Sequence, residues 1–277
     1  MAIKDILVAL TSYPEPTPAS SAANAVSVAA TLGAHLAALS FETRVQVPGH
    51  VISVPMVEGV IAKEIARSRD NARDLLAAFD AAAGKAGILH ETILEKCLLD
   101  EVPDLLVKYA RLRDLTILPV PPTRDQWDAE MIIFGSGRPT LILPEGPARK
   151  PFTLGTIVVA WDFSRAAARA VSDALPMLEL AKQVRVITVV NEKAIENNRS
   201  GEELAKNLAR HRINVVLDEV DAKGRRIGEV LQSYVSAHDA DLLVMGAYGH
   251  SRLREFVLGG ATKSLLAEPP LPVLLSH

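Results

Sequence analysis

The sequence predicts an α/β protein with two tandem domains, each built on an open five-stranded parallel sheet sandwiched by helices. Short apolar strands alternate with alanine-rich helical segments along the 277 residues, which is typical of a parallel sheet covered on both faces. The order β-α-β-α-β-α-β-α-β occurs twice. Apolar residues make up 49% of the chain and aromatic residues only 4%, a composition suited to helices packed on such a sheet.

The repeat can be followed strand by strand. The matching strands are "DILVAL" (5–10) with "TIVVAW" (156–161), "AHLAALSFE" (34–42) with "VRVITVVNE" (184–192), "DLTILPV" (114–120) with "DLLVMGA" (241–247), and "RPTLILPE" with "LPVLLSH". The alanine-rich segments after the two first strands, "ASSAANAVSVAATLG" and "SRAAARAVSDALPMLELA", are predicted helices. Proline, glycine and charge replace periodicity in the linker "PEGPARKPF" (144–152). The predicted domains are therefore residues 1–146 and 152–277.

The two copies differ in length in the middle. Matching positions are 151 residues apart at the first strand but 127 apart at the fourth. The first copy carries the apolar insertion "VQVPGHVISVPMVEGV" (45–60) and then a long helix, predicted at about 57–86, in which "RSRDNARD" (67–74) is expected to be a solvated face. The second copy has only a short polar helix around 200–211. The insertion either lines a pocket or interface, or packs as a loop over its own domain.

Composition excludes several classes of function. The net charge of −3 and the absence of a basic run give no electrostatic reason to expect nucleic acid. No apolar run approaches the ~18 residues needed to span a bilayer, and no signal peptide is visible before the first strand. The lone Cys97 cannot form an internal disulfide, and it is expected to be a small buried or half-buried residue, with redox sensing as the alternative. These features predict a soluble cytoplasmic protein without a membrane partner.

Catalytic motifs are not found. "GGATKS" places Lys263 within a predicted helix and lacks the spacing of a phosphate-binding P-loop, and there is no G-x-S-x-G elbow. The seven histidines are scattered, so no metal site is predicted, and His250 is expected to be a turn residue. Because no nucleophile is paired with a base, no catalytic residue is assigned, and the protein is expected to be at most a slow ATPase.

The segment "VMGAYGHSRLREFVLGGATKSLL" (244–266) carries the strongest candidate site. Gly246 to Arg252 form a predicted strand-to-helix turn, and a helix N-terminus offers backbone N–H groups suited to phosphate. Glycines let the backbone approach a ligand closely. The first strand of the same copy ends in "AWDF", so Asp162 is expected at the same carboxyl edge, where open parallel sheets bind ligands.

The same residues also permit a purely structural interpretation. Gly246 and Gly249 then serve as turn residues, and the pair Gly259–Gly260 allows a helix to pack closely on the sheet. Asp162 and Ser164 then cap the helix that follows them.

The spacing G-x2-G-x9-G, together with "VVAWDFS" and "VITVVNE", resembles the universal stress protein family, and the resemblance covers the whole chain. It implies a tandem member with strand order 3-2-1-4-5 in each domain. Some members of the family bind ATP and others do not. In the members that bind ATP, a strand-end aspartate and a valine hold the adenosine end. The resemblance implies that Asp162 and Val190 take these roles in this chain. The ribose and phosphates then contact Gly246, Gly249, Gly259, Gly260 and Ala261.

One departure weakens the expected affinity for ATP and Mg²⁺. The family's ATP-binding pattern has Ser or Thr after the third glycine, where this chain has Gly260, although Thr262 is close in sequence. A hydrogen bond to a charged acceptor contributes ~1.5–3 kcal/mol, which is one to two orders of magnitude in affinity.

The first domain lacks the motif. Thr11 replaces the aspartate, and Pro119, Pro121 and Pro122 remove N–H groups where the glycine loop would need them. The glycines of "FGSGRP" (134–139) are expected to form a turn into the last strand. The first domain is therefore predicted to be a degenerate partner with a structural or regulatory role.

Two functions from different classes follow. The first is a stress-response protein that binds ATP in its second domain as a regulatory ligand, with the domains packed as a pseudo-dimer partly through their last strands. A further homodimer and a protein partner of unknown identity are expected. The alternative is a scaffold without nucleotide, which binds a protein or an apolar small molecule through the insertion at 45–60.

Overall fold

The computed structural model describes residues 2–44, 55–121, 127–146, 150–191, 200–247 and 260–277. The first half contains β1 (Asp5–Leu10), α1 (Ala19–Leu32), β2 (His35–Arg44), α2 (Pro55–Ala86), β3 (His90–Leu98), a 3-10 turn (Leu99–Glu101), α3 (Val102–Arg111), β4 (Leu115–Val120), α4 (Trp127–Gly135) and β5 (Thr140–Pro144). The second half contains β6 (Thr156–Ala160), α5 (Arg165–Leu178), β7 (Gln183–Val190), α6 (Ser200–Arg210), β8 (Val215–Asp221), α7 (Ile227–Ala237), β9 (Leu242–Gly246), α8 (Gly260–Ala267) and β10 (Val273–Ser276).

The ten strands of the described residues form one sheet in the order β3-β2-β1-β4-β5-β10-β9-β6-β7-β8. Each half, read from its outer edge, has the order 3-2-1-4-5, so the predicted fold class is confirmed. Pairing is parallel within each half. The halves join where β5 and β10 pair antiparallel, with Val273 opposite Ile142 and Leu275 opposite Thr140. The expected pairing of the two last strands is therefore present.

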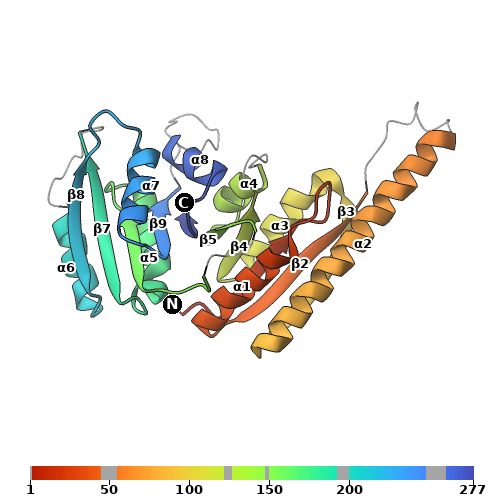
Figure 1. Cartoon of the computed structure of the whole chain (residues 1–277), viewed down its shortest axis with the longest axis horizontal. Coiled ribbons are helices and arrows are strands. Elements are labelled where there is room, and N and C mark those ends of the chain that lie inside the picture. Colours follow the sequence, from red (N-terminus) through yellow and green to blue (C-terminus); the bar gives the residue numbers. More distant parts are fainter. Residues whose placement is uncertain (1, 45–54, 122–126, 147–149, 192–199, 248–259) are drawn as a thin grey trace.

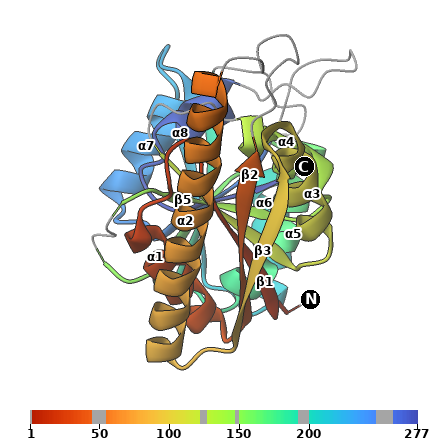
Figure 2. The ribbon, with the colours of Figure 1, turned by 90° about the vertical axis from the view of Figure 1, so that its right-hand side faces the viewer.

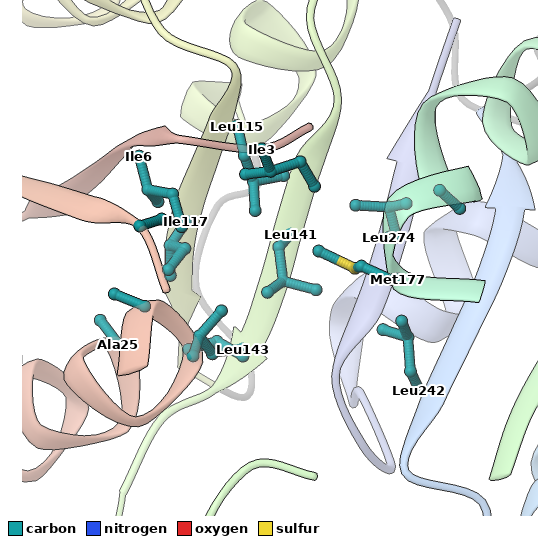
Figure 3. Packing of buried hydrophobic residues seen from close by; sticks show 14 of the residues in the cluster. Ile3, Ile6, Ala25, Leu115, Ile117, Leu141, Leu143, Met177, Leu242 and Leu274 are labelled. Atoms are coloured by element: carbon teal, nitrogen blue, oxygen red, sulfur yellow. The ribbon is translucent and has the colours of Figure 1, made fainter. Parts of the chain in front are cut away.

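The helices cover both faces of this sheet (Figures 1 and 2). Side chains of α1, α2, α5 and α6 share one apolar core with one face of the strands. Side chains of α3, α4, α7 and α8 share a second core with the other face. Neighbouring strand residues alternate between the cores, as Leu141 and Ile142 do in β5. The first core runs across the junction, where Leu141 lies toward Met177 of α5 and Leu274 of β10 (Figure 3).

The predicted difference in length between the two copies lies mainly in α2. This helix has 32 residues against 11 in α6, and it begins at Pro55, two residues before the predicted start. At about 1.5 Å per residue it is roughly 30 Å longer than its counterpart. Its N-terminal part projects beyond the end of the sheet (Figure 1). Val60, five residues after the start of α2, is 56% exposed.

One prediction for α2 is wrong. The segment 67–74 is not a solvated face throughout, because Ser68 and Ala72 are fully buried against the rest of the domain. The charged residues between them face outward. Ser68 and Ala72 are four positions apart and therefore lie on the same, buried side of the helix. Among the described residues, no helix is long and apolar enough to span a membrane.

Candidate functional site

The carboxyl ends of β6 and β9 lie side by side in the second half. Val159 of β6 pairs with Val244 of β9, so the residues that follow both strands meet at one edge. β7 borders β6 on its other side and ends there at Val190. The structure thus brings Asp162, Val190 and Gly246 to the same edge of the sheet.

Gly246 ends β9 in direct contact with the N-terminus of α5. A Cβ atom on Gly246 would lie 2.5 Å from the backbone nitrogen of Ala167 and 2.6 Å from the carbonyl carbon of Ala166. Its φ is not in the left-handed region. The glycine is therefore required by close approach and not by the geometry of a turn.

Asp162 and Ser164 shape the turn from β6 into α5. The backbone N–H of Ser164 donates to Asp162 Oδ1 at 3.0 Å, and the N–H of Ala167 donates to Ser164 Oγ at 3.0 Å. Ser164 is the N-cap, as the structural interpretation proposed, whereas Asp162 lies two residues before it. The carboxylate of Asp162 is exposed at the end of β6, where it is accessible to a ligand.

Two aromatic residues flank Asp162, and neither was predicted to belong to the site. Trp161 is buried, and its indole Nε1 donates to Ser200 Oγ at the start of α6 at 3.1 Å. Phe163 has a positive φ of 60° and is 48% exposed, with its ring centroid 6.2 Å from that of Trp161. Their positions in "AWDFS" are visible in the sequence, but the backbone conformation of Phe163 has no sequence signal.

The end of β7 is polar beyond Val190, which is itself half-buried. Asn191 adopts φ 63°, and its side-chain amide donates to Asp221 Oδ2 at 2.9 Å. The backbone N–H of Lys223 donates to Asp221 Oδ1 at 2.8 Å. These hydrogen bonds, that from Lys223 first, lower the pKa of Asp221 from its ordinary value. The carboxylate therefore keeps a negative charge at this edge at neutral pH.

α8 begins at Gly260, one of the predicted contacts, and continues with Ala261. A Cβ atom on Gly260 would have no heavy-atom neighbour within 4 Å. The prediction that Gly260 allows a helix to pack closely on the sheet is therefore wrong. The space beside this residue is open. Thr262 is 2% exposed, so its side chain is directed into the protein and not toward that space. The other predicted residues of this motif, Gly249, Gly259 and the turn residue His250, lie outside the described residues.

The matching edge of the first half has a different chemistry. Registers place Thr11 at the position of Asp162, Glu42 at that of Val190, and Pro119 at that of Gly246. The pyrrolidine of Pro119 has no N–H to offer a phosphate. Glu42 is buried and forms an ion pair with Lys96 of β3, with 3.2 Å between its Oε2 and Nζ.

Buried hydroxyl groups tie α2 to this first-half edge. Ser68 Oγ lies 3.2 Å from Ser12 Oγ and 2.9 Å from Thr43 Oγ1, and it accepts the backbone N–H of Thr43 at 3.0 Å. Ser12 Oγ donates to the carbonyl oxygen of Phe41, and Asn71 donates its amide to the carbonyl of Ser12 at 2.9 Å. At this edge of the first half, the hydroxyl groups therefore form hydrogen bonds with other groups of the protein. The second half presents an exposed carboxylate at the matching position.

Metal and redox chemistry find little support in the described part of the chain. It contains no group of three or more His, Cys, Asp or Glu side chains placed to hold a metal ion. Cys97 is free and buried, as predicted. Burial first, and then the carboxylates of Glu101, Glu95 and Asp100, raise the pKa of its thiol to about 11. The thiolate that redox sensing requires is therefore scarce at neutral pH.

Comparison with known proteins agrees with this architecture. Residues 153–277, which include the whole second sheet half, match the profile of the Universal stress protein family. A universal stress protein from Archaeoglobus fulgidus is 14% identical with a TM-score of 0.72, and the superposition covers 98% of this chain and 96% of that one. A putative universal stress protein from Pseudomonas aeruginosa is 18% identical with a TM-score of 0.61, covering 99% and 93% of the two chains. At these identities the likeness shows the shared fold, including its tandem arrangement.

A curated relative matches over a shorter segment. Universal stress protein Slr1230 from Synechocystis sp. is 44% identical over 46 residues, which are 17% of this chain and 16% of the relative's length. This match covers too little of either protein to transfer an activity.

Proposed function

We propose that this chain is a stress-response protein that binds one adenine nucleotide, ATP with Mg²⁺, in its second domain as a regulatory ligand. One observation carries the proposal: at Gly246 the end of β9 touches the N-terminus of α5, beside the exposed Asp162. A carboxylate that can bind the hydroxyl or amino groups of adenosine thus lies at the edge of the sheet where the glycine-containing segment after β9 begins. The domains of this proposal are residues 1–146, the degenerate domain, and 152–277, the binding domain.

Each predicted residue takes one role in this proposal. Asp162 and Val190 hold the adenosine end. The ribose and phosphates are held by Gly246, Gly249, Gly259, Gly260 and Ala261. The open space beside Gly260, at the first residue of α8, supports this assignment because a phosphate needs room.

Mg²⁺ fits this arrangement only as a companion of the phosphates. Asp162 offers one carboxylate, of which Oδ1 already accepts an N–H, and the described residues supply no further cluster of ligands. Mg²⁺ retains most of its waters and binds phosphate oxygens in such sites.

A nucleotide that is bound but not hydrolysed can act as a regulator by shifting the protein between two conformations. Nucleotide binding would favour one conformation of the second domain and so change its affinity for a protein partner. We further propose that the protein acts in the cytoplasm and forms a homodimer, without nucleic-acid or membrane partners.

Titration calorimetry with ATP and Mg²⁺ tests the proposal. The wild-type chain should bind at one site, and Asp162→Asn should weaken binding, because the amide keeps the acceptor for Ser164 N–H but loses the charge. Asp239→Asn is the matched control, since its side chain is 97% exposed near the opposite edge of the sheet. Two sites per chain would contradict the degenerate assignment of the first domain. Absence of heat and of a thermal shift up to millimolar ATP would overturn the nucleotide proposal.

A second candidate is the scaffold that binds a protein or an apolar small molecule through the insertion at 45–60. The projecting N-terminal part of α2 favours it (Figure 1), as does the exposure of Val60, five residues after the start of that helix. A photoreactive residue placed next to Val60 should give a protein adduct in cell extract that Val60→Asp abolishes. If the wild-type protein and the Val60→Asp variant give the same adducts, the result would count against this function.

A further inference from the structure

Phe163 has a backbone conformation that a bulky residue rarely adopts. Its φ is 60°, in the left-handed region, where a Cβ atom crowds the backbone. It is also 48% exposed, although the large apolar side chains of this chain are mostly buried. A site at which an exposed aromatic side chain coincides with backbone strain is a candidate for function.

The corresponding position of the first half has a different backbone conformation. The register of the two halves places Ser12 at the position of Phe163. Ser12 is not among the residues with positive φ, and it is 2% exposed. Its hydroxyl points inward and donates to the carbonyl of Phe41. The connections differ in length, since residues 11–18 lie between β1 and α1 and residues 161–164 lie between β6 and α5, so the conformation of Phe163 belongs to the shorter connection of the second half.

The ring of Phe163 is held in place from one side. It meets Trp161 edge to face, with 6.2 Å between centroids and 64° between the ring planes. Trp161 is in turn fixed by burial and by its hydrogen bond to Ser200. The exposed ring therefore has a rigid support, and Phe163 directly follows the exposed Asp162 in the chain.

We infer that Phe163 is the base-stacking residue of the second domain, and that the ligand must carry a planar aromatic base. This inference rests on the proposed nucleotide function and deepens it. Stacking on a phenyl ring tolerates different bases because every base has a π-face. Phe163 thus accounts for affinity toward nucleotides as a class, while the polar groups around it discriminate between bases.

Substitutions at position 163 separate stacking from packing. Phe163→Ala should weaken ATP binding roughly tenfold to hundredfold, and Phe163→Tyr, which keeps the ring, should bind within about threefold of wild type. Phe163→Gly should lose the same affinity as the alanine variant without lowering Tm below it, because glycine accepts the positive φ without strain. Inorganic tripolyphosphate, which has no base, should bind wild type and Phe163→Ala equally.

Fluorescence of Trp161 gives an independent signal in a Trp127→Phe background, since the chain has two tryptophans. ATP should change the emission, whereas tripolyphosphate should not. Equal ATP affinities of wild type and Phe163→Ala would overturn the inference and leave the proposed function standing. Failure of the wild-type chain to bind ATP would overturn both. A loss of affinity in Phe163→Tyr as large as in Phe163→Ala would also contradict stacking.

Discussion

Gly246 and Ala167 are so close that no side chain fits between them. A Cβ atom at residue 246 would lie 2.5 Å from the backbone nitrogen of Ala167, well inside van der Waals contact. The neighbours at this point are mainly backbone atoms, which cannot rotate away. The end of β9 can therefore approach the beginning of α5 this closely only because residue 246 has no side chain.

Gly246→Ala should lower the free energy of unfolding by about 1–3 kcal/mol, because the added methyl group overpacks a rigid contact. It should also weaken ATP binding by moving α5 away from the edge of β9. Urea denaturation and calorimetry measure the two effects. Gly260→Ala is the steric control, since that position is open, and equal stability losses in both variants would contradict the contact argument.

Gly260→Ser should strengthen ATP binding about tenfold or more. The hydroxyl would restore a donor to a charged acceptor, which contributes ~1.5–3 kcal/mol, and the site has room for it. Titration of this variant beside Gly260→Ala isolates the hydroxyl from the added carbon. If the serine and alanine variants bind alike, the missing hydroxyl does not limit affinity.

The order of elements was predictable because each has a local signal. β1 was predicted to the residue, since "DILVAL" is a short apolar run bounded by charge and a turn. The strand order came from family resemblance and not from the strands themselves, because their apolar patterns are too alike to specify neighbours. The buried role of Ser68 was missed because a serine between charged residues has the pattern of a solvated face, and only the partners Ser12 and Thr43 reveal it.

The site was less predictable than the fold. The sequence placed Asp162 and Gly246 at one edge, but it left two explanations for each glycine. For Gly246 and Gly260 the answer depends on which atoms lie across the gap, and those atoms belong to segments distant in sequence. The positive φ of Phe163 is likewise a property of the assembled turn.

Asp241 should make stability sensitive to acid. It accepts hydrogen bonds from Gly155 N at 2.7 Å, Thr156 N at 3.0 Å and Thr153 Oγ1 at 2.9 Å, and it pairs with Lys150 Nζ at 2.6 Å. Burial alone raises the pKa of this carboxyl, but Lys150, Thr156 and Thr153 together hold it below its ordinary value. A lowered pKa in the folded state stabilises the protein above the unfolded pKa of about 3.9, and this stabilisation is lost as pH falls through the folded pKa.

The free energy of unfolding should therefore drop below about pH 4, and Asp241→Asn should flatten that part of the pH profile. The variant should also be less stable at neutral pH by about 1–3 kcal/mol, because charge-assisted hydrogen bonds are lost. Asp239→Asn, which removes an exposed carboxylate near Asp241, serves as control in urea denaturation across pH. If the free energy of unfolding of Asp241→Asn falls below pH 4 as steeply as that of the wild type, the acid sensitivity comes from other carboxylates. Asp5, whose pKa is also lowered, is one such group.

Ser68→Ala should destabilise the first domain by about 1–3 kcal/mol, because the buried N–H of Thr43 and its hydroxyl lose their partner. ATP affinity should stay unchanged, since the proposed site lies in the other half. Chemical denaturation and calorimetry on the same preparation check both statements. Ser233→Ala is the control, because it removes an exposed hydroxyl that donates to the carbonyl of Glu229 within α7. A parallel loss of ATP affinity in Ser68→Ala would show that nucleotide also depends on the first domain.

The antiparallel pairing of β5 with β10 has a consequence for how the two halves are made and how they diverge. β10 follows the other nine strands of the sheet in sequence, so during synthesis the edge of β5 stays unpaired, and open to other nascent chains, until β10 has left the ribosome. Once formed, the pairing is intramolecular, and its effective concentration does not depend on protein abundance. The two halves therefore always meet one to one. With this one-to-one pairing the two edges need not be alike: the first half has Thr11 and buried hydroxyl groups at its edge, whereas the second half exposes Asp162.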